Sequence, residues 1–159
     1  AQTKATTWYN AGVQVIFAAA GGAGSSAMSA ADEQTGKHVI GVDADQSGDS
    51  QSVITSALKG VGEAAQAALA DFYGGTWVGG RTISLGAAEG GVGLPSDFSR
   101  FGDLADEAED AYNTILPLIV DGTINVPTND KASLGAFLTS LGVSNAALVE
   151  KAEPAEETE

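Results

Sequence analysis

The stretch that decides the fold is Val13-Gln14-Val15-Ile16-Phe17-Ala18-Ala19-Ala20-Gly21-Gly22-Ala23-Gly24, an apolar run that ends in a glycine-rich turn. Such a run is typical of a strand buried in a parallel sheet. A second apolar run, Val39-Ile40-Gly41-Val42, leads directly into Asp43-Ala44-Asp45. Ser25 or Ser26 is expected to cap a helix between the two strands. Strand, helix and strand in this order predict a βαβ unit and an α/β fold with a parallel sheet flanked by helices.

Helices are expected on both sides of this unit. Residues 1–10 are predicted to form a helix that Gly12 closes. A second helix, ending at Gly74-Gly75, is expected to bury one face, because apolar residues recur at helical spacing; they are Leu58, Val61, Ala65, Leu69 and Phe72. A third helix is predicted over 104–118, with Asp103 as its cap, Gly122 as its stop and a kink at Pro117.

Three further segments carry weaker patterns. Residues 82–85 and 91–94 alternate around a glycine-containing turn and predict a β-hairpin. Residues 124–127 predict a short strand, and residues 134–141 a last helix. The terminal run 150–159 is rich in Glu, Ala and Pro and is expected to be a disordered acidic tail, because it cannot bury enough apolar surface to offset chain entropy.

Composition limits the partners. The chain has 159 residues, enough for one domain with a hydrophobic core. Seven basic and 21 acidic residues give a net charge of −14, which repels phosphate backbones and anionic lipid headgroups. Nucleic acid and membrane surfaces are therefore poor candidates. The chain contains no cysteine, which excludes disulfides and thiolate metal sites.

Two candidate sites follow the predicted strands, at the edge of the sheet where open α/β folds bind ligands. Gly21 and Gly22 let a ligand approach the backbone, although a simple tight turn also explains them. Asp43 ends the second strand, where a carboxylate accepts hydrogen bonds from the vicinal hydroxyls of a ribose; a solvated Asp that opens a loop is the alternative.

These residues leave three classes of protein open. A Gly-x-Gly-x-x-Ala turn followed by an acidic residue matches the dinucleotide fingerprint, which suits a nucleoside binder or a dinucleotide-dependent oxidoreductase. Asp43 and Asp45 also suit a Mg²⁺-dependent phosphohydrolase, with Lys59 as a partner. Lys59 is expected in the first turns of the second helix. His38 is the only histidine and is interpreted as structural.

A family resemblance rests on five segments, in order and spacing. They are residues 15–24 (VIFAAAGGAG), 39–46 (VIGVDADQ), 54–59 (ITSALK), 90–95 (GGVGLP) and 121–127 (DGTINVP). Together they resemble the basic membrane protein family of ABC-transporter substrate-binding lipoproteins, which includes purine nucleoside receptors. The resemblance covers residues 1–130 and leaves residues 131–149 unassigned, with one helix expected there.

The resemblance implies a type I periplasmic-binding-protein-like fold of two lobes that close on a solute. This chain would supply most of the second lobe, the first being largely missing. The implied ligand is a small solute, a purine nucleoside above others, held by Asp43 and Lys59 and approached by the backbone of Gly21 and Gly22. The implied partners are the membrane subunits of an ABC transporter, and the implied location is outside the cytoplasmic membrane with a lipid anchor on the parent protein. Neither catalysis nor a cofactor or metal is expected, and surface left open by the missing lobe favours a homodimer of the fragment.

Overall fold

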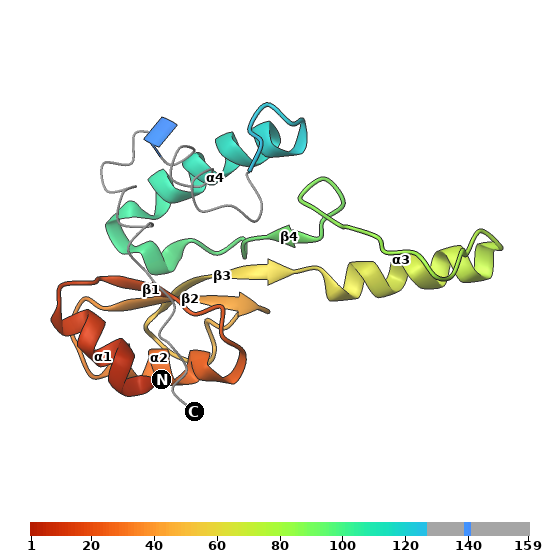
Figure 1. Ribbon diagram of the computed structural model, residues 1–159. Helices are drawn as coiled ribbons and strands as arrows, with labels where there is room; N and C mark the ends of the chain where they lie inside the picture. The colour runs from red at the N-terminus through yellow and green to blue at the C-terminus, as the bar shows by residue number, and fades with distance from the viewer. Residues whose placement is uncertain (127–138, 141–159) are drawn as a thin grey trace. The chain divides into compact units, whose positions relative to one another are not determined.

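The computed structural model describes residues 1–126 and 139–140. The chain divides into two compact units, residues 1–117 and residues 118–159. The elements in chain order are α1 (Gln2–Asn10), β1 (Val15–Phe17), the 3-10 helix η1 (Gly21–Ala23), α2 (Gly24–Asp32), β2 (His38–Asp43), β3 (Val53–Lys59), α3 (Val61–Gly74), β4 (Val92–Gly93), the 3-10 helix η2 (Ser99–Leu104) and α4 (Ala105–Val120) (Figure 1). Within the described residues, no helix is both long and apolar enough to span a bilayer.

The first unit is built on a four-stranded sheet in the order β1-β2-β3-β4. The first three strands are parallel, with Phe17 opposite Ile40 and Asp43 opposite Leu58. Strand β4 runs antiparallel to β3. The predicted βαβ unit is thus confirmed as β1-α2-β2, and with it the α/β class and the mainly parallel sheet.

The core lies between the sheet and the helices α1 and α2, which cover the same face in Figure 1. Val39 and Val53 are fully buried under small side chains of α2, including Ala30 and Ala31. Small residues let the helix backbone approach the sheet closely, and the β-branched valines fit the pleated strand surface. Tyr9 joins α1 to this core: its ring is 2 % exposed and its hydroxyl donates to the carbonyl of His38 at 2.8 Å.

Strand β3 corrects the prediction for Lys59. Residues 53–59 form a strand that pairs with β2, so Lys59 ends a strand and does not lie in the first turns of a helix. The helix α3 begins at Val61 and ends at Gly74, where Gly75 adopts a left-handed φ of 75°. The prediction that this helix buries one face was also wrong, because none of its residues is buried. Figure 1 shows α3 leaving the end of β3 and leading away from the sheet.

The predicted hairpin was wrong as well. Residues 82–85 form no strand, and Val92–Gly93 pair with β3 instead. The predicted caps Ser25 and Ser26 make no capping bond at α2, which begins at Gly24; the Ser25 hydroxyl donates to the Gly22 carbonyl.

The second unit is described through residue 126 and again at residues 139–140. The predicted helix over 104–118 is confirmed as α4, which begins at Ala105 in the first unit, contains Pro117 and ends at Val120 in the second. Gly122, with a φ of 79°, follows the helix end as predicted, and the Ile124 N–H donates back to the Leu118 carbonyl. Residues 124–126 are not a strand. The predicted helix over 134–141 lies outside the described residues except for Thr139 and Ser140, which are helical, and the predicted tail over 150–159 lies wholly outside them.

Candidate functional site

The candidate site lies where the three parallel strands end. A hollow of about 560 Å³ opens there, and its lining includes Phe17, Gly21, Asp43, Lys59, Leu85 and Val92. A second hollow of about 500 Å³ shares Gly21 and Asp43 and adds Gly22, Ser25, Asp45 and Gln46. All four residues proposed from the sequence therefore lie around two hollows that share Gly21 and Asp43, because carboxyl ends of parallel strands meet at one edge of a sheet.

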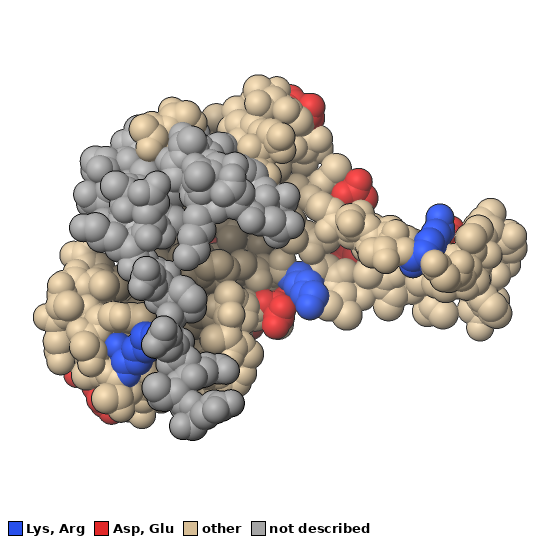
Figure 2. All heavy atoms as spheres, viewed as in Figure 1, with Lys and Arg blue, Asp and Glu red and all other residues tan. Residues whose placement is uncertain are grey.

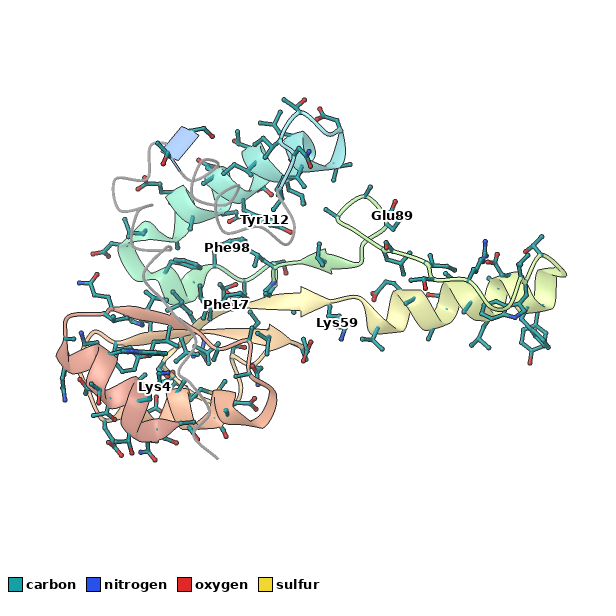
Figure 3. All side chains as sticks on the ribbon, in the orientation of Figure 1. Lys4, Phe17, Lys59, Glu89, Phe98 and Tyr112 are labelled. Carbon is teal, nitrogen blue, oxygen red and sulfur yellow. The ribbon has the colours of Figure 1, made fainter. Side chains whose placement is uncertain are left out.

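Asp43 and Lys59 form the polar centre of this edge. The Lys59 Nζ lies 3.9 Å from Asp43 Oδ1, and the two side chains are 67 % and 68 % exposed. Their closeness follows from the register of β2 and β3, in which Asp43 is opposite Leu58. Figure 3 places Lys59 at the end of β3, and Figure 2 shows one basic and one acidic side chain in contact there. An exposed pair of this kind is weak, so both groups stay available to a ligand.

The backbone at Asp43 is unusual. Asp43 has a φ of 68° and is the only non-glycine residue with a positive φ in the described part of the chain. The N–H of Ala44 donates to the carbonyl of Val42 at 2.8 Å, which closes a three-residue γ-turn centred on Asp43. Asp tolerates this region better than most residues, yet the conformation still costs free energy. The turn sets the direction in which the carboxylate leaves the strand end.

The glycine turn leaves its backbone open. Gly21 has a φ of 53°, a conformation that favours glycine, and a Cβ built on Gly21 or Gly22 would meet no atom within 4 Å. Packing therefore does not require glycine at position 22. The free space on this side means that a ligand can approach the main chain directly.

Strand β4 positions Lys59, a contribution that the sequence analysis missed. Lys59 is opposite Val92 in the antiparallel pair, and the N–H of Gly60 donates to the Gly91 carbonyl at 2.9 Å. A Cβ on Gly60 would collide with the carbonyl oxygen of Gly90, so glycine is needed for this approach. The sequence does contain glycines at 60, 90 and 91, which would permit a close approach of two main chains. The sequence around each of them does not show that these glycines contact one another.

Gln46, Ser56 and Arg100 also went unnoticed at the sequence level. Gln46 follows Asp43-Ala44-Asp45 and bonds back to the end of β2, and Ser56 is fully buried on β3. Arg100, on η2, donates to the carbonyls of Ser47, Ser50 and Val53 and so anchors the loop after Asp43. Near Arg100 in the chain, Phe98 makes an aromatic contact with Tyr112, and their ring centroids are 5.7 Å apart. Both residues are labelled in Figure 3.

His38 has no arrangement suited to metal binding. It begins β2, its carbonyl accepts the Tyr9 hydroxyl, and its Nδ1 is buried without a hydrogen-bond partner. Among residues 1–126 and 139–140, no group of three or more His, Cys, Asp or Glu side chains is placed to hold a metal ion.

A comparison with protein families finds one whose model matches most of the chain. Residues 1–130 match the Bmp family, described as ABC transporter substrate-binding protein PnrA-like. The chain belongs to this family.

Relatives within the basic membrane protein family are identical to the chain at about a third of the aligned positions. Basic membrane protein D of Borreliella burgdorferi (strain JD1) is 37 % identical over 147 residues, which cover 88 % of this chain and 41 % of that protein. Basic membrane protein B of Borreliella burgdorferi is 35 % identical over 135 residues, covering 82 % of this chain and 37 % of the relative. The chain thus spans about two fifths of the length of these relatives.

Solved structures show the same fold in other solute-binding proteins. An ABC transporter solute-binding protein from Aeropyrum pernix K1 superposes with a TM-score of 0.60 at 24 % identity, covering 91 % of this chain and 49 % of that one. A second, from Conexibacter woesei, gives a TM-score of 0.57 at 22 % identity, covering 79 % and 41 %. The expected periplasmic-binding-protein-like fold of this family member is thereby confirmed.

Proposed function

We propose that the protein is the substrate-binding component of an ABC importer, which captures a nucleoside or a similar small solute outside the cytoplasmic membrane without changing it chemically. The observation that carries the proposal is the pairing of Asp43 and Lys59, 3.9 Å apart, at the mouth of a hollow that Gly21 also lines. Family membership supports the same class of function.

The pair is suited to a ribose. A carboxylate has two oxygens and no proton to donate, so Asp43 accepts hydrogen bonds from two vicinal hydroxyls at once. Lys59 has three donors and no acceptor, so it binds the hydroxyl oxygens from the other side. Hydrogen bonds to charged groups contribute about 1.5–3 kcal/mol each when water is kept away. Both side chains are about two thirds exposed, so tight binding requires a further surface that covers the ligand.

That surface is proposed to be a first lobe that closes over the site. Helix α3 and the segment after it expose large apolar side chains, among them Phe72 at 61 %, Tyr73 at 84 % and Val78 at 57 %. Exposed apolar patches of this kind mark interaction surfaces. In the parent protein they would contact the first lobe; in the isolated fragment they would favour a homodimer. A lipid anchor and the membrane subunits of the transporter complete the proposed assembly.

Calorimetry on the full-length protein tests the function. Inosine, adenosine, guanosine and NAD are titrated against wild type, Asp43→Ala and Asp110→Ala. We expect nucleosides to bind, Asp43→Ala to abolish the heat, and Asp110→Ala to leave it nearly unchanged, because Asp110 is an exposed residue of α4 that lines neither hollow. Binding of NAD alone would support the dinucleotide alternative, and turnover of a phosphate ester only with Mg²⁺ would support the hydrolase.

A further inference from the structure

Among the described residues, the side chain of Gln46 bonds to the backbone of the γ-turn at Asp43. Its Oε1 accepts the N–H of Val42 at 2.9 Å, while the carbonyl of Val42 accepts the N–H of Ala44 at 2.8 Å. Both the N–H and the carbonyl of Val42 are therefore hydrogen-bonded, which fixes the peptide groups on either side of this residue. Asp43 follows Val42 and is the central residue of the γ-turn. Strand β1 ends at Phe17, opposite Ile40, so the Val42 N–H lies beyond the end of that neighbour and Gln46 supplies its acceptor.

Gln46 is itself fixed to the sheet. Its backbone N–H donates to the hydroxyl of Ser56, which is fully buried on β3, and its Nε2 donates to Asp49. Gly41 provides the space: a Cβ there would lie 2.6 Å from Ser56 Oγ and 2.9 Å from Gln46 Oε1. Gln46 thus packs on the face of the sheet over Gly41 and Ser56, with each polar atom of its amide in a hydrogen bond.

A strained backbone persists only where its surroundings enforce it. The Asp43 φ of 68° is such a conformation, and the amide of Gln46 is the side chain that bonds to the turn from outside it. We propose that Gln46 is a positioning residue, which aims the Asp43 carboxylate at the vicinal hydroxyls of the ligand and so makes the site selective for ribonucleosides over 2′-deoxyribonucleosides. This inference rests on the proposed function and adds a specificity-determining residue to it.

The test compares affinities of the full-length protein for adenosine and 2′-deoxyadenosine. Gln46→Met removes the acceptor for Val42, and we expect adenosine affinity to fall about tenfold, as for the loss of one hydrogen bond, while 2′-deoxyadenosine affinity changes far less. The ratio of the two affinities then collapses toward one. Gln34→Met is the matched control, because the Gln34 side-chain amide also bonds to the main chain, donating to the Ala30 carbonyl, but Gln34 follows the C-terminal end of α2 and lines neither hollow.

A rescue variant separates positioning from general damage. Gln46→Glu combined with Asp49→Asn keeps the acceptor for Val42 and reverses the second hydrogen bond, so the preference for adenosine should return. Gln46→Asn keeps an amide but is one methylene too short to reach Val42, and it serves if Gln46→Met does not fold. Equal weakening of both ligands by Gln46→Met, or no effect on either, would overturn the inference while leaving the proposed function intact.

The backbone conformation of Asp43 can also be measured in the absence of a ligand. If wild type binds no nucleoside, the proposed function fails, and the backbone of Asp43 is then followed by NMR through its intraresidue HN–Hα coupling and NOE. Loss of the positive φ in Gln46→Met, but not in Gln34→Met, supports a positioning role. Retention of the left-handed conformation in Gln46→Met contradicts it.

Discussion

The guanidinium of Arg100 donates to the carbonyl of Ser47 at 2.8 Å, joining two residues 53 positions apart in the chain. The same side chain reaches the carbonyls of Ser50 at 3.1 Å and Val53 at 3.4 Å. It thereby ties η2 to the loop that connects the Asp43 turn with β3. Long-range bonds of this kind hold the candidate site in shape although part of the loop is exposed.

Arg100→Met should therefore lower the free energy of unfolding by about 2–3 kcal/mol, because it leaves three partly buried carbonyls without their charged donor. Arg81→Met is the control: Arg81 pairs with Asp71 at 3.4 Å where the two side chains are 46 % and 42 % exposed, and its loss should cost at most about 1 kcal/mol. Urea denaturation measures both. Equal effects would show that the Arg100 contacts do not stabilise the loop.

Lys59→Met separates binding from stability. The Asp43–Lys59 pair is exposed, so its removal should change the free energy of unfolding by less than about 1 kcal/mol. Nucleoside affinity, in contrast, should fall at least tenfold, because a donor to the ribose is lost. Thermal melting and calorimetry on the same preparation check both. Unchanged affinity would remove Lys59 from the site.

Gly60→Ala should destabilise the protein by about 1–3 kcal/mol, because its Cβ would collide with the Gly90 carbonyl where β3 meets the returning chain. Gly62→Ala, two residues on, is the matched control. A Cβ there meets no atom within 4 Å, and alanine is the better helix former, so this variant should be up to about 1 kcal/mol more stable. Opposite signs in denaturant melts are the expected result, and a neutral Gly60→Ala would contradict the close approach.

Tyr9 should make the free energy of unfolding fall at alkaline pH. Burial raises the pKa of its hydroxyl, and the negative charge of Asp32 adds to the effect. The folded state therefore retains the proton where the unfolded state loses it, so this contribution is complete below about pH 10 and is lost as pH rises through the folded pKa. Tyr9→Phe should flatten that decline and cost about 1 kcal/mol near neutral pH through the lost bond to His38. Tyr73→Phe, at a residue 84 % exposed, is the control for loss of a tyrosine hydroxyl and should cost little stability near neutral pH.

The sequence predicted the parts of the fold that are local. Apolar runs followed by Gly21 and by Asp43 identified β1 and β2, and parallel pairing then placed both residues at one edge. Lys59 was placed wrongly because Leu58 continues the helical spacing of Val61 and Ala65, whereas the state of 53–59 is decided by pairing with β2. The hairpin failed for a related reason: Val92 found its partner in β3, not in the nearer segment 82–85.

The support around the site could not be predicted. Gln46 reads as an ordinary loop residue, and only the folded chain shows its amide bonded to Val42. Arg100 reads as a surface cation, yet its partners are backbone carbonyls, which carry no signal in the side-chain sequence. Likewise the apolar spacing of α3 indicated a buried face, but in this chain those side chains are exposed.

A crystal structure of the full-length protein with inosine would show directly whether Asp43 holds the ribose. We expect the nucleoside at the carboxyl ends of β1, β2 and β3, with both oxygens of Asp43 within about 3 Å of the ribose hydroxyls and with Lys59 on the same sugar. A nucleoside bound elsewhere, or an Asp43 carboxylate turned away from the sugar, would contradict it.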